Sequence, residues 1–141
     1  CLDYKALSQP AELRAALAAA TPDGIDAHFE NVGGAILDAV MARMNPFGRI
    51  AVCGMIARYD GAAIPLADPA LILTARLKLQ GFIVSEHPAV WPEALAELAG
   101  RVATGALKYR ETIAEGIAAA PGAFLGLLKG RNFGKQLVRL A

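Results

Sequence analysis

The chain has 141 residues, of which 55% are hydrophobic and 19% charged, so it can bury one core of ordinary size and is too short for two independent domains. This composition excludes an intrinsically disordered chain. The 14 basic and 13 acidic residues give a net charge of +1 and are scattered along the sequence, which excludes a nucleic acid or an anionic membrane as an electrostatic partner.

The N-terminal segment predicts a short strand, a helix and a second strand. Residues 1–4 are short and apolar enough for a strand stub. Pro10 is suited to a first helical turn and predicts a helix over residues 10–20. Residues 21–24, Thr-Pro-Asp-Gly, are typical of a turn, and residues 25–29 then predict a buried strand.

The next helix, after Gly34, has a one-sided apolar stripe with the spacing i, i+3, i+4, i+7. The stripe consists of Leu37, Val40, Met41 and Met44. We expect Asn45-Pro46 to end this helix, because proline cannot continue one. Residues 49–53 predict the strand that follows.

The middle of the chain continues the alternation of strands and helices. After a long loop over residues 54–68, a helix passes through residues 71–73, and residues 77–84 predict a third strand. A second apolar stripe predicts another helix, closed by Gly105 in a left-handed cap. This stripe, expected in the core, consists of Trp91, Leu95, Leu98 and Val102.

The C-terminal segment predicts a polar edge strand over residues 107–113, a short helix from Pro121 to Lys129 and a terminal strand over residues 135–140. Alternating strands and helices indicate an α/β fold, with a doubly wound, Rossmann-like and mostly parallel sheet joined by right-handed crossovers.

Small and polar residues follow two strands of this sheet, at residues 30–34 and at Cys53-Gly54. Ligands of such sheets bind in the crevice at the carboxyl ends of the strands. The sequence lacks the G-x-G-x-x-G turn that normally holds a dinucleotide pyrophosphate, and Gly33-Gly34 alone favours a tight turn without ligand. We therefore expect a domain truncated at its N-terminal βαβ unit, with the phosphate-binding turn upstream of Cys1.

The two cysteines, Cys1 and Cys53, have no metal-ligand spacing and form no disulfide framework, which favours a reducing compartment. The first thirty residues lack the apolar stretch of a signal peptide. No window reaches the roughly 18 consecutive apolar residues of a membrane span. These features predict a cytoplasmic protein with no membrane partner.

Six segments resemble the zinc-independent medium-chain dehydrogenase/reductases, in the branch of leukotriene B4 12-hydroxydehydrogenase, prostaglandin reductase and the NADPH-dependent alkenal double-bond reductases. They are FENVGG at 29–34, NPFGRI at 45–50, CGMI at 53–56, LQGFIV at 79–84, LKYRET at 107–112 and NFGKQLV at 132–138. The resemblance runs nearly end to end, in the family's order and spacing.

This resemblance implies that the complete enzyme transfers a hydride from NADP(H) to the β-carbon of an α,β-unsaturated ketone or aldehyde, without a metal. The resulting enolate is protonated at the α-carbon. Such a site holds the nicotinamide against the alkene and places a hydrogen-bond donor at the carbonyl oxygen, where negative charge develops.

The resemblance also assigns roles to single residues. Tyr59 matches a tyrosine that steadies the substrate carbonyl or enolate, acting as a neutral hydrogen-bond donor. Tyr4 matches a contact to the adenosine end of the cofactor. The other cofactor-binding residues that it implies are Asn31, Cys53, Gly54, Met55, Ile56, Phe82, Ile83, Val84 and Asn132.

Several of these residues have a structural alternative. Tyr4 suits a sheet edge, Asn31 suits a helix cap and Asn132 suits a turn. Cys53 is expected to pack, with only its backbone near the cofactor. Residues 82–84 are expected in the core and contribute backbone alone.

Two histidines and two loop residues complete the candidate list. His28 and His87 are predicted to be structural. Ala57 and Arg58 stand where the family commonly has a small polar residue and a glutamine, which leaves substrate preference open.

Two alternatives to the enone reductase remain open: a quinone reductase of the same superfamily, and a non-catalytic cofactor-domain remnant that self-associates. A homodimer through exposed sheet edges is expected in either case. Residues 106–119 are expected to pack on a catalytic domain outside this sequence. The 141 residues alone are expected to be inactive and to bind NADPH weakly.

Overall fold

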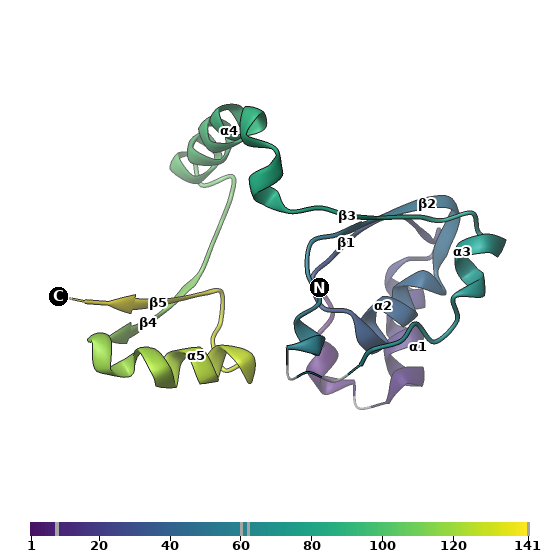
Figure 1. Ribbon diagram of the computed structural model, residues 1–141, viewed down its shortest axis with the longest axis horizontal. Coiled ribbons are helices and arrows are strands. Elements are labelled where there is room, and N and C mark those ends of the chain that lie inside the picture. The colour runs from purple at the N-terminus through teal and green to yellow at the C-terminus, as the bar shows by residue number, and fades with distance from the viewer. Residues whose placement is uncertain (8, 60, 62, 141) are drawn as a thin grey trace. The chain divides into compact units, whose positions relative to one another are not determined.

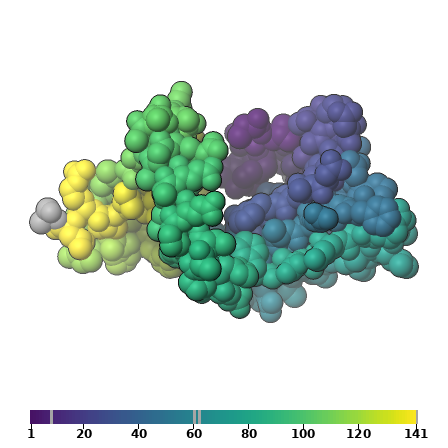
Figure 2. All heavy atoms as spheres, turned by 90° about the horizontal axis from the view of Figure 1, so that it is seen from above, coloured from purple at the N-terminus to yellow at the C-terminus, as the bar shows by residue number. Residues whose placement is uncertain are grey.

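The computed structural model describes residues 1–7, 9–59, 61 and 63–140. The chain forms two compact units, Cys1–His87 and Pro88–Ala141, and each has its own sheet (Figure 1). Figure 2 draws the atoms of the first unit in purple to teal and those of the second in green to yellow.

The first unit contains a three-stranded parallel sheet in the order β1-β2-β3. Its strands are β1 (Ile25–Glu30), β2 (Met44–Val52) and β3 (Lys78–Gly81). Glu30 pairs with Val52, and Val52 pairs with Gly81. The carboxyl ends of all three strands are therefore aligned in one row. The predicted α/β class with a parallel sheet is confirmed.

Three helices belong to this unit: α1 (Pro10–Ala20), α2 (Gly34–Met41) and α3 (Ala70–Thr74). The bounds predicted for α1 are confirmed. Pro10 occupies its first turn, and the Glu12 carboxylate accepts a hydrogen bond from the Gln9 N–H at 3.1 Å, as in a capping box. The buried core joins α2 to the sheet and consists of Leu37, Val40, Met41, Met44, Ile50 and Leu77.

The predicted end of α2 is wrong. The helix ends at Met41, and Met44-Asn45-Pro46 already belong to β2. The pairing of β1 with β2 steps from Ile25–Met44 to Ala27–Arg49, so the β2 segment around Pro46 bulges out of the ladder. A bulge tolerates proline because it needs no ladder N–H there.

The predicted strand stub at residues 1–4 is also wrong. The segment Tyr4–Ala6 forms a single 3-10 turn instead, which begins where the Asp3 carboxylate accepts a hydrogen bond from the Lys5 N–H at 3.1 Å. A short side-chain acceptor of this kind favours a turn over an extended strand.

The third strand is shorter than predicted, because β3 ends at Gly81 and a 3-10 turn covers Val84–Glu86. Ile83 and Val84 are 59% and 60% exposed, so their expected place in the core is wrong.

The second unit contains α4 (Trp91–Ala103), α5 (Ala120–Leu128) and a parallel pair formed by β4 (Glu111–Glu115) and β5 (Lys135–Arg139). Gly105 follows α4 with φ of +71°, which confirms the predicted left-handed cap. The apolar stripe of α4 was expected in the core, but its residues are 39% to 58% exposed, so this expectation is wrong. The residues are Trp91, Leu95, Leu98 and Val102. No helix among the described residues is long and apolar enough to cross a membrane.

Candidate functional site

The segments that follow β1 and β2 are joined to each other by backbone hydrogen bonds. The N–H groups of Cys53 and Gly54 donate to the Glu30 carbonyl at 2.9 and 3.1 Å. The next two contacts run from Ile56 N–H to the Asn31 carbonyl and from Ala57 N–H to the Val32 carbonyl, each at 3.0 Å. Residues 53–57 are therefore fixed along residues 30–32, beyond the carboxyl ends of the sheet.

An open cleft of about 380 Å³ lies at the carboxyl ends of β2 and β3. Its lining consists of Val52, Cys53, Gly54, Met55, Gly81, Phe82, Ile83 and Glu86. The lining is mostly apolar, as in sites for small molecules, and includes two glycines, which let a ligand approach the backbone closely. Five residues predicted to bind a cofactor line it, while Val52, Gly81 and Glu86 were not among the predicted residues.

Phe82 is fixed in this cleft from two sides. Its N–H donates to the Val52 carbonyl at 3.2 Å, and its ring meets the Phe29 ring edge to face at a centroid distance of 5.9 Å. The neighbouring Ile83 N–H donates to the Glu86 carboxylate at 2.9 Å. Residues 82–86, which form one wall of the cleft, are thus held together by a hydrogen bond within the segment.

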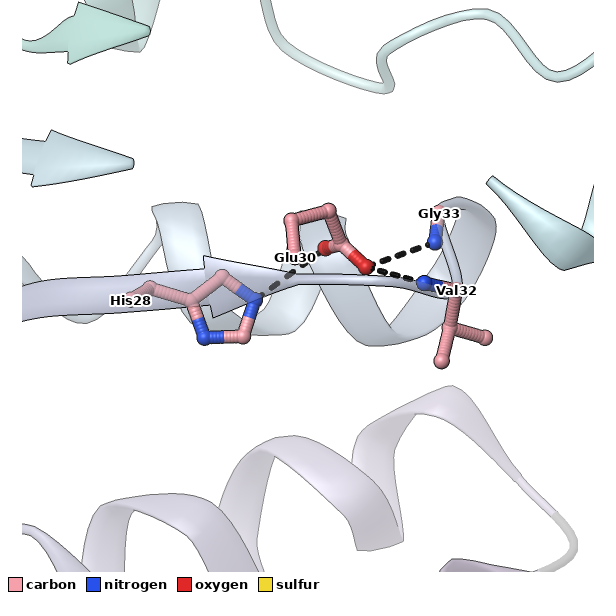
Figure 3. Close-up of polar contacts among 4 residues, drawn as sticks. All are labelled: His28, Glu30, Val32 and Gly33. Atoms are coloured by element: carbon pink, nitrogen blue, oxygen red, sulfur yellow. Dashed lines mark hydrogen bonds and ion pairs between the residues drawn. The ribbon is translucent and has the colours of Figure 1, made fainter. Parts of the chain in front are cut away.

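Glu30, the last residue of β1, is a buried charged residue that sequence reasoning did not single out, and its side chain is 1% exposed. One carboxylate oxygen, Oε1, accepts hydrogen bonds from the N–H groups of Val32 and Gly33, at 2.5 and 2.9 Å (Figure 3). The other, Oε2, lies 3.1 Å from His28 Nε2. An acidic residue directly before a glycine turn is the sequence signal that could have identified it, because its carboxylate can accept from the turn's N–H groups.

Two opposing effects act on the pKa of Glu30. Burial of the carboxyl group raises the pKa, whereas the hydrogen bonds from Gly33 and Val32, together with the hydrogen bond and charge of His28, lower it. The lowering effects prevail, and the pKa lies below its ordinary value of 4.5. Glu30 is therefore an ionised carboxylate at neutral pH.

The lowered pKa of Glu30 predicts a pH dependence of stability. Because the folded-state pKa lies below 4.5, the ionised carboxylate contributes fully above pH 4.5, and the contribution is lost as the pH falls through the folded-state pKa. We expect the difference in free energy of unfolding between wild type and Glu30→Gln to be present above pH 4.5 and to shrink as the pH falls below it. Urea denaturation across the acidic range measures it, and a difference that grows on acidification would contradict this sign.

The helix that follows the Glu30 turn has no side-chain cap. Its N-cap is Gly33, with φ of +79° and ψ of −168°, a conformation that is essentially limited to glycine. Asn31 therefore does not cap α2, and that structural alternative is wrong. Its carbonyl contributes to the site through the bond from Ile56.

Six predicted residues lie outside the cleft lining, namely Asn31, Ile56, Val84, Tyr4, Tyr59 and Asn132. Tyr59, 70% exposed, follows the 3-10 turn Ile56–Arg58, and Tyr4, 51% exposed, begins the turn near the N-terminus. Asn132 belongs to the second unit, where its side chain donates to the Gly134 carbonyl at 2.7 Å, as a turn residue would. The roles assigned to these three side chains stay predictions.

The donor set of the described residues does not fit a zinc ion. Within the described ranges, His, Cys, Asp and Glu side chains do not gather in groups of three or more. Structural and catalytic zinc sites need at least three such ligands.

Comparison with known proteins gives one family and several relatives. A model of the family described as zinc-binding dehydrogenase matches residues 2–100. The chain is 41% identical over 131 residues to the 2-alkenal reductase (NADP(+)-dependent) of Nicotiana tabacum, which covers 92% of the chain and 38% of the relative. It is 42% identical over 130 residues to prostaglandin reductase 1 of Rattus norvegicus, and this match covers 90% of the chain and 40% of the relative.

A solved structure is also similar, the crystal structure of CurA in complex with NADPH from Vibrio vulnificus. It shares 38% identity with a TM-score of 0.81 and covers 91% of this chain and 40% of that one. The chain thus spans about two fifths of the length of the curated relatives and of the solved structure that it matches.

Proposed function

Because this chain belongs to the zinc-binding dehydrogenase family, we propose that it forms the nicotinamide-facing part of the cofactor domain in an NADPH-dependent oxidoreductase. The reaction proposed is reduction of the C=C bond of α,β-unsaturated ketones or aldehydes by hydride transfer. The observation that carries the proposal is the open cleft at the carboxyl ends of β2 and β3, in a chain 41% identical to a 2-alkenal reductase. The similarity to a structure that contains NADPH supports the choice of cofactor.

The cleft fits a nicotinamide ring by its size and by its apolar lining with exposed backbone. When bound, NADPH supplies the hydride. On this proposal residues 53–56 form one side of the ring site and residues 82–84 the other. Three further residues are proposed to bind the cofactor: Asn31, Asn132 and, at the adenosine end, Tyr4.

The proposed role of Tyr59 is to donate a hydrogen bond from its phenol to the substrate carbonyl oxygen. Negative charge grows on that oxygen as the alkene accepts the hydride, so a fixed donor stabilises the transition state more than the ground state. The backbone bonds from residues 56 and 57 to the segment after β1 fix the loop that leads to Tyr59.

The proposal extends to the whole protein. It is a cytoplasmic enzyme that needs no zinc, and residues 106–119 pack on a separate catalytic domain. It forms a homodimer through sheet edges, and β1 and β3 are the two outer strands of the three-stranded sheet formed by the described residues of the first unit. Light scattering on the complete protein tests the dimer, and a monomer at high concentration would contradict it.

The activity is tested with the complete protein that contains this chain. We expect NADPH oxidation with cyclohexenone and with hexenal, far slower oxidation with a benzoquinone, and lower affinity for NADH. Activity confined to the quinone would support the alternative reductase, and no oxidation with any acceptor would contradict the proposal.

A further inference from the structure

Glu30 links the end of β1 to the wall of the cleft. Its carboxylate is buried at 1% exposure and accepts hydrogen bonds from the Val32 and Gly33 N–H groups through the same oxygen (Figure 3). A buried carboxylate is stabilised by such bonds and is costly to leave in any other arrangement. The side chain therefore holds the turn after β1 in one conformation.

The turn that Glu30 holds provides the acceptors for the neighbouring loop. The carbonyl groups of residues 30, 31 and 32 accept all four backbone hydrogen bonds from Cys53, Gly54, Ile56 and Ala57. Cys53 and Gly54 line the cleft. A shift of the turn would therefore move the loop and one side of the cleft with it.

We infer that Glu30 is a positioning residue for the cofactor site, an inference that rests on the proposed function. Its side chain is not part of the cleft lining and touches no reacting atom. Through its bonds to Val32 and Gly33 it sets where residues 53–57 lie, and so determines how well the nicotinamide is held. Misplacement of about 1 Å at a site of this kind can cost on the order of 100-fold in rate.

The hydrogen bonds of the two carboxylate oxygens predict different effects for two substitutions of Glu30. Both turn N–H groups bind Oε1, while Oε2 faces His28, so a glutamine can keep the two turn bonds through its amide oxygen. Alanine removes the acceptor altogether. Glu30→Gln should therefore preserve the position of the loop, whereas Glu30→Ala should release it.

The experiment measures KM for NADPH and kcat with cyclohexenone in the complete protein. We expect Glu30→Ala to raise KM for NADPH about tenfold or more, and Glu30→Gln to stay within about threefold of wild type. The control is Val40→Ala, which removes buried side-chain volume from α2 at 5% exposure, seven residues after Gly33 in the sequence. A purely structural effect lowers the amount of active protein and leaves KM unchanged, as we expect for Val40→Ala.

An unchanged KM in Glu30→Ala, or an equal rise in Val40→Ala, would overturn the inference. Amide hydrogen exchange separates this failure from that of the proposed function. If wild type neither binds NADPH nor reduces cyclohexenone, the proposed function fails and the cofactor role of Glu30 fails with it. Faster exchange at residues 53–57 in Glu30→Ala would then still show the link between carboxylate and loop, and unchanged exchange would refute that link as well.

Discussion

Tyr59→Phe should lower kcat for enone reduction about 10- to 100-fold, because the variant loses only the hydroxyl that donates to the developing enolate oxygen. We place the effect toward the low end of measured losses for such donors because Tyr59 is 70% exposed, and water partly replaces the lost hydrogen bond. KM for NADPH should stay unchanged, since the phenol is assigned to the substrate. Steady-state kinetics at saturating NADPH measures both parameters.

The comparison variant is Tyr109→Phe, which removes the same hydroxyl from a tyrosine of similar exposure, 64%, in the second unit. Tyr109 lies in the segment 106–119 proposed to pack on the catalytic domain and is assigned no contact with the substrate, so its kcat should fall far less than that of Tyr59→Phe. Equal kcat values for Tyr59→Phe and wild type would refute the role of Tyr59 as donor, while leaving the cleft as the cofactor site.

Gly134→Ala should destabilise the second unit by about 2–4 kcal/mol, the sum of left-handed backbone strain and overpacking. Gly134 has φ of +77°, and a Cβ there would lie 2.0 Å from the Arg110 carbonyl oxygen. Lys135 N–H donates to that same oxygen at 2.8 Å, beside the first pair of the β4–β5 ladder, Glu111–Lys135. The clash is with backbone, so relief requires the ladder to shift.

Gly100→Ala is the control for this prediction. Gly100 lies inside α4, where an added Cβ meets no heavy atom within 4 Å, so alanine should stabilise the unit by about 0.5–1 kcal/mol. Native-state hydrogen exchange of the β4 and β5 amides gives the free energy of opening. The account of the Gly134 turn fails if both variants change this free energy in the same direction.

Local patterns in the sequence predicted several elements of the fold because each pattern has a local cause. Pro10 begins α1 and Gly105 follows α4, since proline suits a first turn and glycine adopts a positive φ without cost. The end of α2 could not be predicted in this way. Met44 continues the apolar stripe in spacing, but it fills the core from the start of β2.

Only part of the candidate site could be predicted, because some of its residues have a cause in the local sequence and others do not. Residues 53–55 and 82–83 were found because small residues after a strand, and a family resemblance, both point to the carboxyl ends of the sheet. Glu30 was not found, because its burial depends on two N–H groups of a turn whose conformation is set by Gly33. Exposure of Ile83 and Val84 could not be read from their apolar character, since it depends on where β3 ends.

The central claim is that the cleft lined by residues 52–55 and 81–83 receives the nicotinamide end of NADP(H). A crystal structure of the complete protein with NADP+ tests it most directly. We expect density for the nicotinamide ring between Cys53–Met55 on one side and Phe82–Ile83 on the other. A nucleotide bound elsewhere, with this cleft filled only by solvent, would contradict it.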